Sequence, residues 1–270
     1  MIWYNRDSET REDVNILISE GASAKEILDG QSITEDIKSF TLAETIKNEV
    51  SLNQAPIRDM LRFDIELNTK GLSAIVPAIK LKELDGKIVP QIMGTAIIKN
   101  HKLVGFLDGE ETKTLIFIRN EVKNGLLVEE VKTAASTTFV SLEIFKNKTK
   151  VKPVVDGKNI KFDLDIKTTV AIDEISSTEN FIDEEGQKQL EQITQNTLKQ
   201  RIEALIKKMQ SEYESDILGF GAKLHEVNAQ AWNNVKNNWD EVFKDLKVNV
   251  KIKVHIKNSS MLSKTLEEGE

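Results

Sequence analysis

The residues between Asp216 and Trp239 (DILGFGAKLHEVNAQAWNNVKNNW) include types that could do chemistry: two glycines, a histidine and two tryptophans. A phosphate-binding loop needs a strand before it, a helix after it and several converging backbone amides. The polar end of a predicted helix precedes Gly219 and Gly221 instead, and Lys223 fits neither a P-loop nor a dinucleotide fingerprint. The glycines therefore favour a kink, close helix packing, or a Schellman-type helix end at Gly219.

Candidate acid–base and metal-binding residues are scattered. His101, His225 and His255 lie in three different segments, so no HxxxH-type metal pair is present. An acidic cluster at 183–185 opens a predicted long helix, where acids stabilise the positive end of the dipole. No carboxylate lies in an apolar run that is expected to raise its pKa, and the chain has no cysteine. We expect no enzyme, and no catalytic, metal-binding or cofactor-binding residues.

The two tryptophans belong to an apolar stripe with helical spacing. Trp232, Val235, Trp239, Val242 and Phe243 share one face of a predicted helix, opposite polar side chains. Such spacing indicates packing before ligand stacking. We expect the tryptophans to anchor this helix against a sheet.

Composition excludes several classes of protein. The 270 residues include 37 basic and 44 acidic ones, a net charge of −7, which does not favour nucleic acid as a partner. No apolar run approaches the length of a membrane span, and the first residues, MIWYNRDSETRED, lack the apolar core of a signal peptide. We expect a soluble chain.

The elements that must position these residues follow from hydrophobic periodicity. In the first 66 residues we expect a strand at 14–19, a helix that Ser23 caps and Gly30 ends, and a second helix at 39–50. Strands are expected next at 61–67 and 72–81.

A hairpin should follow at 95–107. Its strands flank Asn100 and His101, and Asp108 is expected to cap a helix directly after it.

The C-terminal part predicts an α+β domain. Residues 139–172 read as three strands, the last two joined at Asp156-Gly157, and 184–213 as one long helix. After further helices, strict alternation returns at 247–257. The order β-β-β-α-α-α-β predicts a long helix and further helices packed on an antiparallel or mixed sheet.

The final strand carries lysines along one face. These lysines either protect an edge strand or pair with Asp163 and Asp165 on a neighbouring strand, which is the simpler interpretation. Alternatively they contact anionic lipid headgroups or an acidic subunit. The residues are Lys247, Lys251, Lys253 and Lys257.

Two separated motifs stand out in the chain. The first consists of Gln210, Asp216, Ile217, Gly219, Phe220, Gly221, Trp232, Trp239 and Phe243. The second consists of Gly94, Thr95, Ala96, Lys102, Leu103, Val104 and Gly105. Together, and in their order along the chain, they resemble the motifs of the Ger(x)C spore germination proteins, the C subunits of nutrient germinant receptors. The resemblance covers Ser8 to Met261, with Ile98 where the family often has phenylalanine.

The resemblance implies a multidomain α+β lipoprotein on the outer face of the spore inner membrane, working with membrane subunits A and B. It implies domains at 1–66 (the remainder of a first α/β domain), 67–128 (mostly β) and 129–262 (α+β), with a tail at 263–270. Family members begin with a signal peptide and a lipidated cysteine, so we interpret this chain as an N-terminally truncated, soluble fragment. The motif residues are then fold-defining.

Three functions remain open from sequence. The favoured one is a non-enzymatic receptor subunit that contributes to assembly and nutrient-triggered germination. The alternative is an extracytoplasmic binding protein for a small molecule or a cell-wall fragment, which a deep pocket with converging polar groups would favour. The third and least favoured function is that of a hydrolase, which requires paired carboxylates or a nucleophile and a base within hydrogen-bond reach in a cleft.

Overall fold

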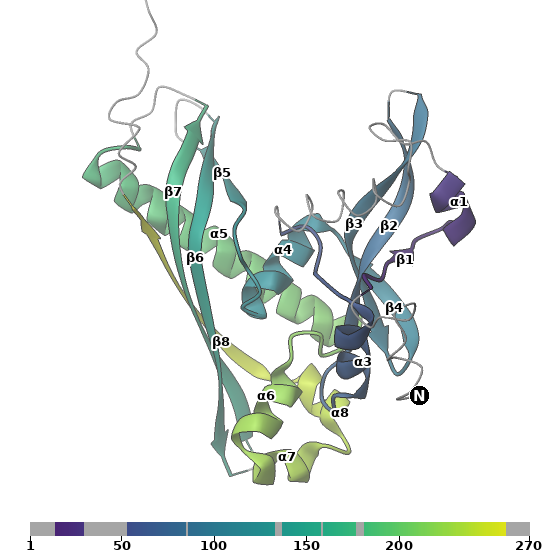
Figure 1. The fold of residues 1–270 in the computed structure, drawn as a ribbon. Coiled ribbons are helices and arrows are strands. Elements are labelled where there is room, and N and C mark those ends of the chain that lie inside the picture. The colour runs from purple at the N-terminus through teal and green to yellow at the C-terminus, as the bar shows by residue number, and fades with distance from the viewer. Residues whose placement is uncertain are drawn as a thin grey trace, which may run out of the picture. The chain divides into compact units, whose positions relative to one another are not determined.

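The computed structural model describes residues 14–29, 53–84, 86–132, 137–157, 159–176 and 181–257 (Figure 1). Contacts group the chain into two compact units. Unit 1 is 1–113 with 207–246, and unit 2 is 114–206 with 247–270. The three domains expected by residue number stay a prediction, and their boundaries differ from those of the two units.

Unit 1 contains a four-stranded sheet in the order β1-β2-β3-β4. Its strands are β1 (Ile18–Ser19), β2 (Ala74–Leu84), β3 (Lys87–Lys99) and β4 (Lys102–Leu107). β1 is parallel to β2, and the other pairs are antiparallel. The first six residues of β2 are all buried, as expected of an apolar run covered on both faces. The strand predicted at 14–19 is thus limited to the two residues of β1.

Several predicted local structures of unit 1 are confirmed. Asn100 and His101 form the β3–β4 turn with φ of 49° and 61°. α4 (Gly109–Ile118) begins after Asp108, whose Oδ1 accepts a hydrogen bond from the Glu111 amide at 2.8 Å. Ser23 likewise precedes α1 (Ala24–Asp29) and accepts from the Glu26 amide at 3.2 Å. The helix predicted at 39–50 lies outside the described residues.

The strand predicted at 61–67 is wrong, because this segment forms α3 (Met60–Asn68). The Asp59 side chain caps the helix by accepting from the Arg62 amide at 2.7 Å. Phe63 and Leu67, four residues apart, then pack on one core cluster. A short apolar alternation fits both periods, and the cap decides between them.

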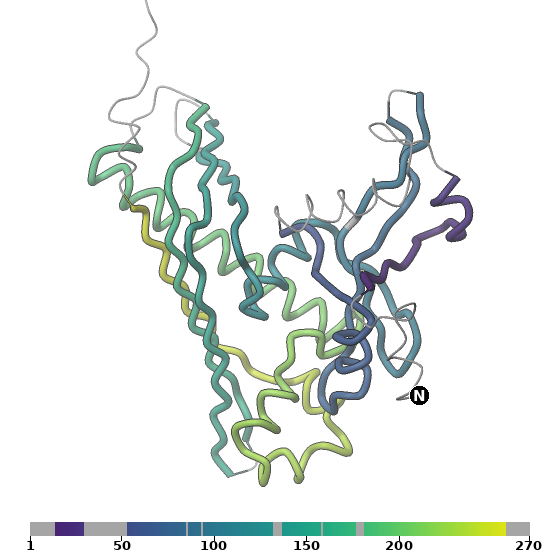
Figure 2. The backbone as a smooth tube through the Cα atoms, in the orientation of Figure 1, coloured from purple at the N-terminus to yellow at the C-terminus, as the bar shows by residue number. Residues whose placement is uncertain are grey.

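Unit 2 contains the second sheet, in the order β5-β6-β7-β8. Its strands are β5 (Leu126–Lys132), β6 (Thr137–Asp156), β7 (Asn159–Ile175) and β8 (Lys247–Ile256). Figure 2 shows β8, in yellow, beside β7, to which it is parallel; the other pairs are antiparallel. Residues 139–156 were predicted as two strands but form one, with a register shift between Ile144 and Lys146. β5 was not predicted.

α5 (Glu184–Ser211) runs along this sheet and confirms the predicted long helix (Figure 1). Leu190, Leu198 and Ile202 are buried along its length, as are Val250 and Val254 of β8. Its side chains also reach the outer edge of β8. Gln195 accepts from the Val254 amide at 3.3 Å, and Glu191 accepts from the Ile256 amide at 2.7 Å. The fold is α+β with mixed sheets, as predicted.

Candidate functional site

The sequence motif around Asp216 forms a network of hydrogen bonds within unit 1 that joins Asp216, Gly219, Phe220, Gly221 and Trp239. We call this network the Asp216 knot. The chain leaves α5, and α6 (Phe220–Val227) begins after Gly219. Asp216 Oδ1 accepts from the amides of Gly219 (2.9 Å) and Phe220 (3.2 Å), and Oδ2 accepts from the Gly221 amide at 2.7 Å. The Trp239 indole Nε1 donates to the same Oδ2 at 3.1 Å. The carboxylate therefore binds the N-terminal amides of α6 and fixes a tryptophan 23 residues away.

Burial governs the charge of this carboxyl group. Asp216 is 4% exposed, and its removal from water raises its pKa to about 6, although the four donors act in the opposite direction. The expectation that no carboxylate has a pKa raised by burial is therefore wrong for Asp216. Its oxygens already accept four hydrogen bonds, which favours a structural role over proton transfer to a substrate.

Gly221 allows two backbone segments to approach closely. A Cβ on Gly221 would lie 2.6 Å from the Gly71 carbonyl oxygen and 2.7 Å from a Trp239 ring carbon. The Ala222 amide also donates to the Gly71 oxygen at 3.1 Å. Close packing, one of the roles expected for these glycines, is confirmed. The Schellman end expected at Gly219 is wrong, because Gly219, with φ 85°, precedes α6.

The aromatic side chains surround this contact. Trp232 is on α7 (Ala229–Val235), and Trp239 and Phe243 are on α8 (Trp239–Lys244). The single helix predicted for them is therefore divided in two. The indole centroids lie 5.5 Å apart at 62°, and the Trp239 and Phe243 rings lie 6.5 Å apart. All three side chains are buried, as expected of packing residues. Trp232 lies against Gly71 and Trp239 against Gly221, and anchoring against a sheet stays a prediction.

The other motif residues secure neighbouring segments. Gln210 Nε2 donates to the Phe243 and Leu246 carbonyls at 2.9 and 2.8 Å, so it binds the chain where α8 ends. A Cβ on Gly105 would lie 2.1 Å from the Tyr213 ring, whose hydroxyl donates to the Phe106 carbonyl at 3.0 Å.

Gly94 lies in β3, away from the Asp216 knot. With φ 103° it has a conformation that favours glycine, and a Cβ there would lie 2.1 Å from the Leu107 carbonyl oxygen.

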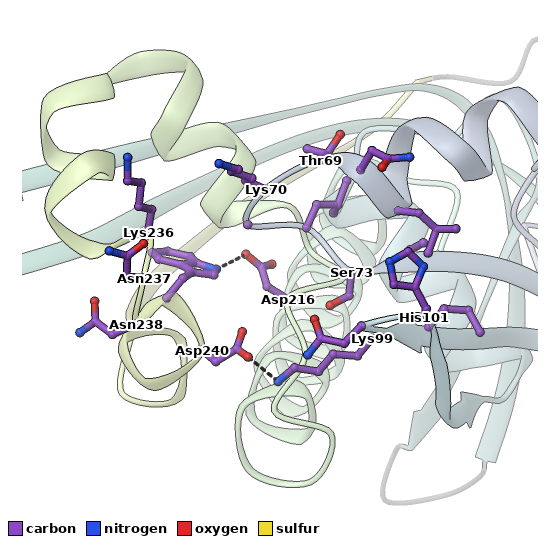
Figure 3. A pocket seen from close by; sticks show the side chains of 18 of the residues that line it. Thr69, Lys70, Ser73, Lys99, His101, Asp216, Lys236, Asn237, Asn238 and Asp240 are labelled. Carbon is purple, nitrogen blue, oxygen red and sulfur yellow. Dashed lines mark hydrogen bonds and ion pairs between the residues drawn. The ribbon is translucent and has the colours of Figure 1, made fainter. Parts of the chain in front are cut away.

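A polar cavity of about 610 Å³ adjoins the knot (Figure 3). Three segments form its wall together with Asp216: the α3–β2 connection (67–74), the β3–β4 turn (98–101) and the start of α8 (236–241). Figure 3 shows Lys99 extending to Asp240, and their Nζ and Oδ2 atoms lie 2.9 Å apart. Lys99 also donates to the Glu214 carbonyl.

The cavity lining is mainly polar and carries several cations. Lys70, Lys99, Lys236 and His101 contribute basic groups, Asn237 and Asn238 contribute amides, and Asp216, Asp240 and Glu241 contribute acidic groups. Such a lining suits a small polar molecule with several hydrogen-bonding groups. The sequence did not predict these residues as a site, because they come from three segments with no common motif.

The remaining candidate residues lie elsewhere. Lys247, Lys251, Lys253 and Lys257 are exposed on or directly after β8, in unit 2. His255 is exposed beside Glu191, and His225 contacts the Trp232 ring at 5.6 Å between centroids. In the part of the chain that the structure describes, no group of three or more His, Cys, Asp or Glu side chains is arranged to hold a metal ion. No described helix is long and apolar enough to cross a bilayer.

The fold is similar to one solved structure, the crystal structure of the GerBC protein. The TM-score is 0.69 at 23% identity, over 94% of this chain and 72% of that one. At this level of identity the similarity shows that the two chains share a fold, and nothing about function.

Family models identify the chain further. The model "Spore germination B3/ GerAC like, C-terminal" matches residues 93–260, and "Spore germination protein N-terminal domain" matches 1–81. The chain belongs to this GerAC-like family of spore germination proteins, as its two motifs predicted.

The curated relatives include two proteins of Bacillus subtilis. Spore germination protein YndF is 28% identical over 207 residues, which is 70% of this chain and 51% of the relative. Spore germination protein B3 is 29% identical over 189 residues, which is 68% of this chain and 48% of the relative. The chain thus spans about half the length of these relatives.

Proposed function

We propose that this chain is part of a non-enzymatic lipoprotein subunit of a spore germinant receptor and contributes to receptor assembly and nutrient-triggered germination. Membership of the GerAC-like family supports a germination role. The full-length protein is proposed to be lipid-anchored on the outer face of the spore inner membrane. Its partners are proposed to be the A and B membrane subunits of the receptor.

The proposal that the subunit is not an enzyme is supported by the hydrogen bonds of the Asp216 knot, whose polar side-chain atoms bind other groups of the protein. Asp216, the one described carboxyl group whose pKa is raised to about 6, accepts four hydrogen bonds from the protein itself. Gln210 donates to two backbone carbonyls in the same way. Such contacts hold segments together, which is what a subunit needs in order to present a defined surface to partners.

Co-purification tests the subunit proposal. This chain and the full-length protein are each incubated with detergent-solubilised A and B subunits, and an unrelated acidic protein of similar size serves as control. We expect specific capture of A or B by the full-length protein and saturable competition by this chain. If the full-length protein captures neither subunit, and spores without it germinate normally on every nutrient that wild-type spores use, the proposal is wrong.

The polar cavity favours a second candidate function, capture of a small polar molecule by this subunit. Amino acids, sugars and short cell-wall fragments are suitable probes in a thermal-shift or calorimetric titration. We expect a binder to lose affinity in Lys70→Ala and Lys236→Ala, whereas Lys207→Ala, an exposed lysine outside the cavity lining, should bind as wild type. Equal binding by all three variants would place the molecule elsewhere.

A further inference from the structure

One face of the unit 2 sheet is covered by lysines from three adjacent strands. We call it the lysine face. Its ten members are Lys146, Lys148, Lys150 and Lys152 of β6, Lys161 and Lys167 of β7, Lys247, Lys251 and Lys253 of β8, and Lys257 directly after β8. All ten are exposed.

The strand register places these side chains on the same side of the sheet, because directly opposed residues share a face. Lys148 is opposite Lys167, which is opposite Lys253. Lys161 is opposite Lys247 in the same way. The neighbours that alternate with them, including Phe162, Leu164, Ile166 and Val250, are buried on the other side.

The charge of this face is opposite to that of the chain as a whole. Ten of the 37 basic residues gather here, in a protein whose net charge is −7. Two acidic residues of β7 lie among them: Asp163 is opposite Lys152, and Asp165 is opposite Lys150 and Lys251. Among the described residues none of the ten lysines has an ion-pair partner. Asp163 accepts instead from the Asn249 side chain at 2.8 Å.

Protection of a sheet edge does not account for this arrangement. β8 is an edge strand, and lysines there discourage pairing with another chain. Lys161 and Lys167 are on β7, however, which is paired on both sides. Like charges directly opposite one another destabilise a sheet, so the row Lys148–Lys167–Lys253 works against folding. We therefore infer that binding to a partner, and not the stability of the sheet, accounts for these lysines.

We propose that the lysine face docks on a bilayer surface of anionic phospholipid headgroups. The face is about 33 Å long, since it extends along the ten residues of β8 at about 3.3 Å each. All ten cations are lysines. A protein partner with fixed carboxylates favours the bidentate fork of arginine, whereas diffuse attraction to a charged surface needs only point charges.

An aromatic side chain at one end of the face fits the same partner. Phe145 lies where the β6–β7 register shifts and is 47% exposed. The Lys257 Nζ lies 3.1 Å from its ring centroid. An exposed apolar ring beside a lysine suits this partner, because a phenylalanine can enter the boundary between headgroups and acyl chains while the lysine stays among the headgroups. This inference goes beyond the proposed function and does not depend on it.

Vesicle co-sedimentation of the full 270-residue chain tests the proposal. The probes are vesicles of phosphatidylglycerol mixed equally with phosphatidylcholine, and vesicles of phosphatidylcholine alone. We expect binding to the anionic vesicles only, and its loss at high salt, because exposed charges are screened. In the variant Lys148→Gln, Lys167→Gln, Lys251→Gln, Lys253→Gln, affinity should fall by about fivefold per lysine. The variant Lys148→Arg, Lys167→Arg, Lys251→Arg, Lys253→Arg should keep it.

A control variant separates the face from net charge. Lys82→Gln, Lys87→Gln, Lys123→Gln, Lys207→Gln removes the same charge from exposed lysines outside the face, and circular dichroism confirms the folding of every variant. The control should bind the anionic vesicles as wild type. The proposal is overturned by absent vesicle binding, by equal losses in the two glutamine variants, or by tighter binding of the face to soluble poly-glutamate, which would indicate an acidic protein.

Discussion

At the scale of single residues, Asp216 combines burial with four hydrogen-bond donors from two segments. Asp216→Asn keeps the shape but points an amide NH₂ group at N–H donors, leaving at least one of them unpaired. We expect the free energy of unfolding to fall by about 2–4 kcal/mol, measured by urea unfolding with tryptophan fluorescence. Asp240→Asn, which removes the exposed partner of Lys99, should change it by at most about 1 kcal/mol.

The raised pKa of Asp216 predicts a pH dependence. Its carboxyl group ionises near pH 3.8 in the unfolded chain and near pH 6 in the folded protein, so the folded state binds more protons between these values. Over this window the free energy of unfolding should fall as pH rises, by roughly 3 kcal/mol relative to Asp216→Asn. Urea unfolding of both proteins from pH 4 to 7 measures the difference. A rise instead would show that the donors outweigh burial.

Gly221 offers a test of close packing. Gly221→Ala places a methyl group 2.6 Å from the backbone oxygen of Gly71, which must move. We expect a loss of about 1–3 kcal/mol in the free energy of unfolding. The control Gly109→Ala, at the first residue of α4 with a flexible side chain 3.4 Å away, should be neutral or slightly stabilising. Equal effects of the two changes would contradict the packing role.

The sequence revealed the members of the Asp216 knot but not what they do together. Asp216 reads as a polar residue between a helix and an apolar stretch, and nothing nearby shows that it is buried. Its burial depends on Trp239, and that of Gly221 depends on Gly71, far along the chain. Long-range partners of this kind leave no periodic signal in a single sequence, and the cavity residues were missed for the same reason.

At the scale of elements, the long and strongly periodic segments were predictable. α5 and the alternating β8 follow from their apolar spacing alone. The prediction was wrong at 61–67, where an apolar alternation forms α3, and at 232–243, where one apolar stripe is divided between α7 and α8. Asp59 caps α3, so a capping side chain set a boundary there that hydrophobic spacing did not show. The break between α7 and α8 has no such signal, because Asn238 precedes α8 without a side-chain hydrogen bond to it.

The contact between α5 and β8 predicts a change in hydrogen exchange. Glu191 accepts from the Ile256 amide, one of the edge groups that no strand pairs on that side. In Glu191→Ala this amide should exchange about tenfold faster, the equivalent of about 1.4 kcal/mol of lost protection. The Gln192 side chain donates to Asn196 on the exposed side of α5, so Gln192→Ala should leave the exchange of the Ile256 amide unchanged.

At the scale of the whole molecule, the segregation of charge predicts a conflict between stability and binding. Lys167→Gln removes the central charge from a row of three lysines. The free energy of unfolding should rise by about 0.2–1 kcal/mol at low salt, and the gain should vanish at high salt. Urea unfolding at two salt concentrations measures this. A loss of stability at low salt would mean that Lys167 is held by Asp165 and is not repelled by its neighbours.

Each unit is made of two separate stretches of the chain, which passes from one unit to the other after Lys113, Ile206 and Leu246. Neither unit is therefore a continuous stretch that a single cut could release, and a protease that nicks one crossing leaves each unit still covalently joined to part of the other. On the ribosome, β7 emerges long before β8, so the edge that β8 will occupy stays open while about 70 residues are synthesised. Until synthesis has passed Ile256, the unpaired backbone groups of that edge can pair with another chain.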